Sequence, residues 1–262
     1  MRKLLVLAFL VAIPLSADET AYLALQSGWL GFVTPVFDHG IHGEGQIVAV
    51  LDTGVDWTSC YFAESDGSKP PFNTGSPQLG LAWQVDLSRR KVIAYDFLFS
   101  CDQFPGAPGC DVPSTHPIYD YVERDHGTHA AASALGDSGA PIAHDYADGV
   151  APGAKLVVQD AGLSATDACT SRPGIGCPVK ITPALDQAYK QGARIHSNSW
   201  GDHGNATASY SQPARDIDAF VYAHPDMLVV FNTGNYYAAT APPPSSLSSP
   251  GCAKNTIQVG GT

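Results

Sequence analysis

The chain has 262 residues, of which 44% are hydrophobic and 15% are charged, enough for one large globular domain with a hydrophobic core. It carries 14 Lys and Arg residues against 25 Asp and Glu residues, a formal net charge of -11. This acidic balance argues against a nucleic acid or an anionic membrane as a partner, because both attract basic surfaces.

The first predicted element is a secretory signal peptide at residues 1–17. Arg2 and Lys3 give it a positive start, an apolar run follows, and residues 15–17 end in small side chains. This is the order of a signal peptide, and the apolar run is too short for a stable helix across a membrane. We therefore expect a secreted protein, extracellular or periplasmic, with no stable membrane anchor and a mature start near Asp18.

Six apolar runs of strand length follow along the chain. Several are continuously apolar and rich in Val and Ile, which is typical of strands buried on both faces of a parallel sheet. The six predicted strands lie at residues 46–52, 91–97, 155–162, 193–201, 226–235 and 256–262.

Helical patterns lie between these strands, at residues 127–135, 182–192 and 213–225. The second is expected to begin with a Thr cap and a Pro in its first turn, and the third carries an apolar stripe. Alternating strands and helices predict an α/β fold, with a doubly wound, mostly parallel central sheet and helices on both faces. Ligands of such folds bind beyond the carboxyl ends of the strands.

Two stretches rich in Pro, Gly and Ser, residues 58–90 and 99–120, are predicted to be surface loops. The chain also has six cysteines, which fit an exported protein with disulfides and allow about 15 pairings. There is no CxxC motif, which argues against a zinc or redox site. Small loops would be closed by Cys101 with Cys110 and by Cys169 with Cys177, leaving Cys60 and Cys252 to pair with each other or with something outside the chain.

Asp52 follows directly from a buried strand in the stretch VAVLDTGVD, residues 48–56. An acidic side chain at the carboxyl end of a central strand is costly unless other groups satisfy it. One interpretation is an Asp that caps the turn through its own backbone. The other is a carboxylate held rigidly to orient an imidazole.

The stretch DHGTH, residues 125–129, places His126 at the start of a helix and His129 three residues later. Two histidines at this spacing can face one metal ion, but the stretch lacks the HExxH pattern of zinc proteases. We therefore favour a catalytic role for His126 and a structural role for His129.

Two further strand ends carry polar groups. In VVFNTGN, residues 229–235, the Asn235 amide can donate to a developing oxyanion, although an ordinary Gly-Asn turn is the simpler interpretation. In SNSWGDHG, residues 197–204, the segment Ser199-Trp200-Gly201 can pair with an extended peptide, whereas the simpler interpretation makes Trp200 a core residue.

Taken together and in order, these motifs resemble those of the subtilisin-like serine proteases. The stretches VLDTGVD, DHGTHAAASA, GVAPGAKLVVQD, NSWG and VVFNTGN each match a motif of that family, and the similarity covers residues 43–262. The resemblance implies a secreted serine endopeptidase that hydrolyses peptide bonds in proteins or peptides, acts as a monomer and requires no cofactor. The implied domains are the signal peptide, an N-terminal segment at 18–42 and the peptidase domain at 43–262.

The resemblance also implies roles for particular residues, in the family's chain order Asp, His, Ser. Asp52 would orient the general base His126, and Asn235 would donate to the oxyanion. The two walls of the substrate site would be Ser199, Trp200 and Gly201 on one side and Asn232, Thr233 and Gly234 on the other.

The nucleophile is the point of departure from the family, which carries it in a Gly-Thr-Ser-x-Ala stretch that this sequence lacks. We expect the chain to stop before that serine-bearing helix, to be inactive by itself, and to have no folding prosegment between the signal and the domain. The alternatives are a non-catalytic peptide-binding pseudoprotease and, third, a metal-dependent hydrolase. Calcium is frequent in the family, and residues 136–149, with Asp137, Asp145 and Asp148, form a candidate loop without EF-hand spacing.

Overall fold

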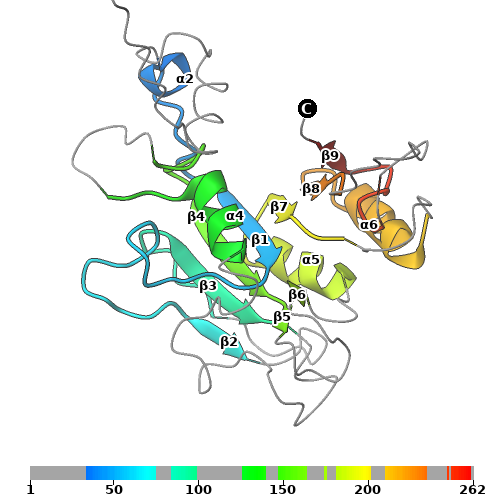
Figure 1. The fold of residues 1–262 in the computed structure, drawn as a ribbon, viewed down its shortest axis with the longest axis horizontal. Coiled ribbons are helices and arrows are strands. Elements are labelled where there is room, and N and C mark those ends of the chain that lie inside the picture. Colours follow the sequence, from blue (N-terminus) through cyan, green and yellow to red (C-terminus); the bar gives the residue numbers. More distant parts are fainter. Residues whose placement is uncertain are drawn as a thin grey trace, which may run out of the picture.

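A seven-stranded parallel sheet forms the centre of the molecule (Figure 1). The structure is a computed structural model that describes residues 34–74, 84–98, 126–139, 147–163, 174–175, 181–201, 210–234, 247 and 249–260. The strand order in the sheet is β2-β3-β4-β1-β7-β8-β9, and every neighbouring pair is parallel. Its strands are β1 (Ile47–Asp52), β2 (Phe72–Thr74), β3 (Val92–Phe97), β4 (Lys155–Asp160), β7 (Ile195–Asn198), β8 (Leu228–Asn232) and β9 (Ile257–Val259).

Helices cover both faces of this sheet. On one face α4 (His126–Leu135) packs over β1 and β4, and on the other α5 (Ile181–Lys190) packs beside α6 (Gln212–Ala223). The short helix α2 (Pro35–Asp38) precedes the sheet, and β5 (Gly162–Leu163) and β6 (Gly174–Ile175) form a separate antiparallel pair. The predicted doubly wound α/β fold is confirmed.

The central strand β1 shows how side chains divide between the two faces. Val48 and Val50 join the core cluster under α4, together with Ala131 and Leu135 of that helix. Leu51 points to the opposite face, where it packs with residues of α5 and α6. Alternation along a strand buried on both sides therefore accounts for the continuous apolar run in the sequence.

The structure corrects two expectations about individual elements. The stretch 58–90, expected to be a surface loop, contains the edge strand β2 and the fully buried Phe62. Helix α5 begins at Ile181, so Thr182 lies inside the helix and does not cap it. In both cases an apolar side chain that can be buried against the sheet decides the outcome over local turn signals.

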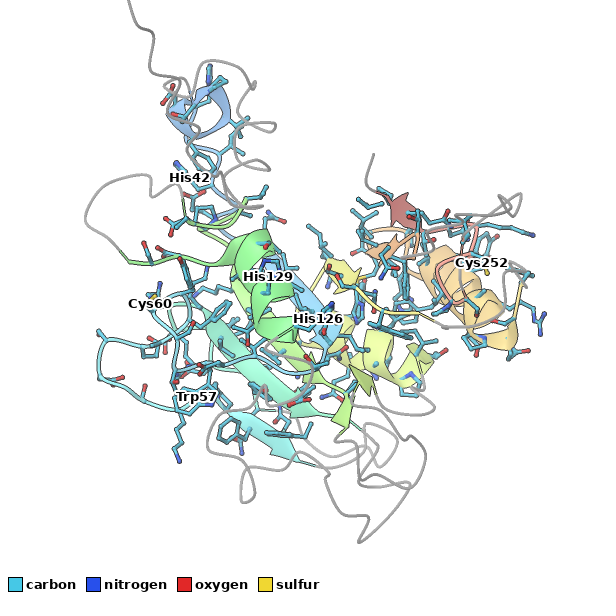
Figure 2. All side chains as sticks on the ribbon, in the orientation of Figure 1. His42, Trp57, Cys60, His126, His129 and Cys252 are labelled. Atoms are coloured by element: carbon cyan, nitrogen blue, oxygen red, sulfur yellow. The ribbon has the colours of Figure 1, made fainter. Side chains whose placement is uncertain are left out.

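Cys60 and Cys252 do not pair with each other, because they lie on opposite sides of the described molecule (Figure 2). The other four cysteines, the signal peptide and the predicted loop at 99–120 all lie outside the described residues. Among the helices that the structure describes, none is long and apolar enough to cross a bilayer.

Candidate active site

Asp52 is the last residue of β1 and lies at the carboxyl-terminal edge of the sheet. Its side chain is only 1% exposed, and its Oδ1 accepts a hydrogen bond of 2.8 Å from the backbone N–H of Thr53. Its Oδ2 is buried and has no hydrogen-bond partner among the described residues. The carboxylate thus caps its own turn, as the simpler interpretation held, but this contact leaves it able to bind a second group.

That second group is His126, the first residue of α4. Its Nδ1 lies 2.7 Å from Asp52 Oδ1, while 42% of the histidine side chain remains exposed. The structure therefore brings together two residues that are 74 positions apart in the sequence. Since a carboxylate only accepts, Nδ1 is the donor in this contact and a neutral ring carries its lone pair on Nε2.

A second contact fixes the start of α4 against the turn after β1. Thr53 Oγ1 accepts a hydrogen bond of 2.9 Å from the backbone N–H of Gly127. A Cβ atom at Gly127 would lie 2.1 Å from the carbonyl oxygen of Gly54, so only glycine allows the helix to come this close. The glycine in DHGTH therefore sets the distance between His126 and Asp52.

Two residues that sequence reasoning missed support the same turn. Tyr95 of β3 donates from its hydroxyl to Asp160 Oδ2 at 3.0 Å, and the same hydroxyl accepts from the backbone N–H of Val55 at 3.0 Å. Asp160 is the register partner of Asp52 on the neighbouring strand β4. The available signal was a tyrosine inside one buried strand and an aspartate at the end of another, but their separation of 65 residues gives no local pattern.

The predicted substrate-binding segments leave the sheet at the same edge. Strand register aligns Leu51 with Asn198 and Asn198 with Phe231, so Ser199 and Asn232 emerge beside Asp52. Trp200 packs edge-on against Phe231, with ring centroids 5.4 Å apart. The simpler interpretation of Trp200 therefore applies in part, because its ring is partly buried against the core, and its role in peptide binding stays a prediction.

The segment that follows β8 forms a tight turn. Asn232 Oδ1 accepts from the backbone N–H of Gly234 at 2.8 Å, and Thr233 donates its backbone N–H to Val259 of β9 at 3.0 Å. Gly234 has a φ of 92°, a conformation that favours glycine. Asn235, the predicted oxyanion donor, lies outside the described residues.

A cluster of three buried polar side chains lies beneath these segments, on the face of the sheet that α5 covers. His196 is fully buried, its Nε2 donates to Gln159 Oε1 at 2.9 Å, and its Nδ1 accepts from Asn198 Nδ2 at 3.0 Å. Asn198 Nδ2 also donates to the backbone oxygen of Val230 at 3.1 Å. Burial lowers the pKa of His196 to about 3, so the ring is neutral.

The other predicted ligands do not gather in one place. His129 is exposed on α4, and Asp137 Oδ2 lies 3.1 Å from the Arg90 guanidinium. Asp148 accepts from the backbone N–H of Ser138, and Asp145 lies outside the described residues. Within the described ranges, no group of three or more His, Cys, Asp or Glu side chains is placed to hold a metal ion.

Comparison with known proteins assigns the family. The model of the subtilase family, Peptidase S8, matches residues 43–262. The chain belongs to the subtilase family. The predicted membership in the subtilisin-like serine proteases is therefore confirmed.

Several curated proteins are similar to this subtilase chain. The serine protease/ABC transporter B family protein tagD of Dictyostelium discoideum is 33% identical over 85% of this chain and 10% of its own length. The subtilisin-like protease SBT2.4 of Arabidopsis thaliana is 26% identical over 61% of this chain and 19% of its own length. The chain thus spans about a tenth of the Dictyostelium relative and about a fifth of the Arabidopsis one.

Among solved structures, the CspB protease of Clostridium perfringens is similar to this chain. The two are 20% identical with a TM-score of 0.48, and the match covers 84% of this chain and 40% of that protein.

Proposed function

We propose that this subtilase chain is part of a secreted serine endopeptidase and supplies Asp52 and His126 to its catalytic triad. The contact of 2.7 Å between His126 Nδ1 and Asp52 Oδ1 carries the proposal. It joins a buried carboxylate to a partly exposed imidazole, the arrangement that a general base and its orienting acid require.

In the proposed reaction a serine hydroxyl attacks the carbonyl carbon of a peptide bond in a protein or peptide. His126 Nε2 takes the hydroxyl proton and returns it to the leaving amine, while Asp52 holds the ring and stabilises the imidazolium. Water then attacks the acyl-enzyme and releases the second product. Asn235 would donate to the oxyanion, and the segments 199–201 and 232–234 would bind the substrate on either side.

We propose that the nucleophilic serine belongs to a part of the protein beyond Thr262, because the printed sequence has no Gly-Thr-Ser-x-Ala stretch. By itself the 262-residue chain should then show only the weak residual catalysis that binding groups provide without a nucleophile. Secretion rests on the pattern of residues 1–17.

The decisive experiment is labelling with a fluorophosphonate, which reacts with an activated serine, on the protein expressed from its full coding sequence. We expect labelling and peptide hydrolysis in the natural protein and loss of both in His126→Ala. Asp52→Asn should lower kcat by about 10⁴-fold, because the wrong tautomer of the histidine is then favoured.

The matched control is His129→Ala, which removes an exposed histidine from the same helix and should leave labelling intact. Full activity in His126→Ala would overturn the proposal. A natural protein that binds peptides without being labelled would be a pseudoprotease, and activity that a chelator removes and zinc restores would indicate a metal-dependent hydrolase.

A further inference from the structure

The first three residues of α4 each contact residues 52–56, the end of β1 and the turn after it. The three contacts measure 2.7, 2.9 and 2.8 Å and are His126 Nδ1 to Asp52 Oδ1, the Gly127 N–H to Thr53 Oγ1 and the Asp56 N–H to Thr128 Oγ1. The start of the helix and this turn therefore move together, and the turn determines where the His126 ring lies.

The middle of the turn is fixed by Tyr95 of β3. The backbone N–H of Val55 donates to the Tyr95 hydroxyl at 3.0 Å, and both residues belong to the core cluster under α4. Tyr95 is fully buried, and its ring lies 5.6 Å from that of Phe72 and 4.9 Å from that of Phe97, measured between centroids. A buried N–H group without an acceptor costs free energy, so the Tyr95 hydroxyl stabilises this position of Val55.

Asp160 of β4 determines which way the Tyr95 hydroxyl points. A carboxylate only accepts, so the hydroxyl donates its one proton to Asp160 Oδ2 at 3.0 Å, and its oxygen accepts from Val55. The other carboxylate oxygen, Oδ1, accepts from the backbone N–H of Gly162 at 2.9 Å. The buried carboxylate is therefore held in place itself, and it keeps the hydroxyl in the orientation that the Val55 contact requires.

These contacts form a continuous path from β4 through β3 to the turn after β1, and the three strands lie side by side in the sheet (Figure 1). The path ends at His126, whose ring must reach both its orienting acid and the proton that it takes. A displacement of about 1 Å at such a group can cost about 100-fold in rate. A small movement of the turn would therefore be visible in catalysis.

We propose that Tyr95 and Asp160 are positioning residues for the Asp52–His126 pair. Asp160 orients the Tyr95 hydroxyl, and the hydroxyl fixes the turn that sets the His126 ring against Asp52. Neither residue touches the substrate or the reacting atoms. The inference rests on the proposed serine protease function and adds to it the two residues that keep the histidine within reach.

The test is steady-state hydrolysis of a chromogenic peptide by the protein expressed from its full coding sequence, under conditions in which every variant is folded. Tyr95→Phe keeps the buried ring and removes only the hydroxyl. We expect kcat to fall by about 10- to 100-fold while KM changes little, because a displaced base slows the chemistry and leaves substrate binding intact. An unchanged kcat would overturn the proposal.

A second background separates positioning from a general disturbance of the site. In His126→Ala there is no imidazole to position, so adding Tyr95→Phe should change the residual kcat by less than about twofold. An equal loss in the two backgrounds would show that the hydroxyl supports the whole site and does not act through His126. That result would overturn the assignment.

Asp160→Asn tests the second residue. Asparagine replaces one carboxylate oxygen by an NH2 group, so either the Tyr95 hydroxyl or the Gly162 N–H loses its acceptor. We expect a lower kcat, and no further loss when Asp160→Asn is combined with Tyr95→Phe, because both act through one hydroxyl. Losses that multiply would remove Asp160 from the assignment. Should Tyr95→Phe fail to fold, Asp160→Asn in the natural and His126→Ala backgrounds provides the same comparison.

The matched control is Tyr189→Phe, which removes another tyrosine hydroxyl that donates to a carboxylate, Asp226 Oδ1 at 3.0 Å, near the end of α5. It should leave kcat unchanged, and an equal loss there would overturn the proposal. The natural protein decides the protease function separately. If it hydrolyses no peptide and no fluorophosphonate labels it, both proposals fail, whereas an active natural protein with an equally active Tyr95→Phe variant rejects the positioning role alone.

Discussion

His196 contacts the side chain of Asn198, which joins the two strands whose ends form the predicted walls of the substrate site. Its Nδ1 accepts from Asn198 Nδ2, the amide that also donates to Val230 on β8. Asn198 directly precedes the segment 199–201, and Val230 lies two residues before Asn232. A neutral imidazole is required here, because a protonated ring would place a second donor against the Asn198 amide.

The pKa of His196 predicts sensitivity to acid. Burial lowers this pKa to about 3, below the ordinary value of 6.5, so the stabilisation is complete above pH ~6.5 and is lost as the pH falls towards 3. We expect His196→Gln to reduce the free energy of unfolding at neutral pH but to flatten its loss between neutral pH and pH ~4. Urea unfolding at a series of pH values measures both effects.

The control for this prediction is His129→Gln, since His129 is exposed and should leave the acid profile unchanged. Asp96 titrates in the same range with the opposite sign, because its raised pKa makes the folded state bind a proton more readily than the unfolded chain. Its contribution is the same in both proteins and cancels in the comparison. An equally steep acid loss in His196→Gln would contradict the assignment.

The proposed oxyanion donor, Asn235, is a second prediction about a single residue. We predict that Asn235→Ala, in the protein expressed from its full coding sequence, lowers kcat by about 10²–10³-fold and changes KM little, a magnitude measured on subtilisin, another member of this family. Steady-state kinetics with a chromogenic peptide separates the two constants. A large rise in KM at constant kcat would assign Asn235 to ground-state binding.

Motif residues at strand ends could be predicted from the sequence, and their supporting contacts could not. Asp52 follows a continuous apolar run and His126 opens a helical pattern, so both ends were expected at one edge of the sheet. The Thr53 contact to Gly127 and the Tyr95 contact to Asp160 join residues far apart in the sequence. Such contacts have no periodicity and follow only from the packed structure.

At the level of elements, Gly127 allows the start of α4 to pack directly against the turn after β1. We predict that Gly127→Ala lowers the stability of the protein and separates His126 from Asp52, because the added Cβ would lie 2.1 Å from a backbone oxygen. Substitutions that force backbone apart in this way typically cost ~1–3 kcal/mol. Urea unfolding measures the loss, and peptide hydrolysis by the protein expressed from its full coding sequence should fall further than stability alone explains.

Gly153→Ala is the matched control for this substitution. Its Cβ would lie 3.0 Å from the flexible Glu44 side chain and 3.1 Å from the backbone nitrogen of Glu44, a much looser approach to backbone than the 2.1 Å at Gly127. A smaller loss of stability and an intact active site are expected. If Gly127→Ala were as mild as Gly153→Ala, the close approach of α4 to the turn after β1 would not be what positions His126.

Strand prediction succeeded where burial on both faces makes a continuous apolar run, as in β1 and β3. It failed for β2, where three residues pair at the sheet edge with no apolar run of their own. The buried carboxyl group of Asp96, which accepts hydrogen bonds from Asn73 and Gln191, also escaped prediction. A carboxylate, an asparagine and a glutamine on core-facing positions look like surface residues until the helix above them is placed.

At the scale of the whole molecule, the sheet face that α4 covers over β1 and β4 stays apolar at β8 and β9, which α4 does not cover. Val229 and Phe231 of β8 are buried towards α6, so Leu228 and Val230 point to the opposite face, with Ile257 and Val259 of β9 paired beside them. Ile257 is 50% and Val259 is 55% exposed in the 262-residue chain. This exposed strip also lies on an edge strand, a position prone to association.

We predict that the double substitution Ile257→Thr with Val259→Thr increases the soluble fraction of the 262-residue chain and lowers its binding of a hydrophobic dye. Threonine keeps the branched shape that strands favour and removes part of the apolar surface. Expression yield and dye fluorescence measure the two effects. The corresponding control is Ile41→Thr, an exposed isoleucine outside the sheet, which should change neither quantity.

The order of strands in the sheet also governs how quickly it can form. β1 occupies the centre, yet its neighbours β4 and β7 follow only at residues 155–160 and 195–198. During synthesis at ~5–20 residues per second, the central strand β1 therefore waits many seconds for its two partners. Strands that are far apart in the sequence lose chain entropy when they meet, before their contacts stabilise the sheet. Refolding after dilution from denaturant should therefore be slow and should depend on protein concentration, whatever the stability of the folded state.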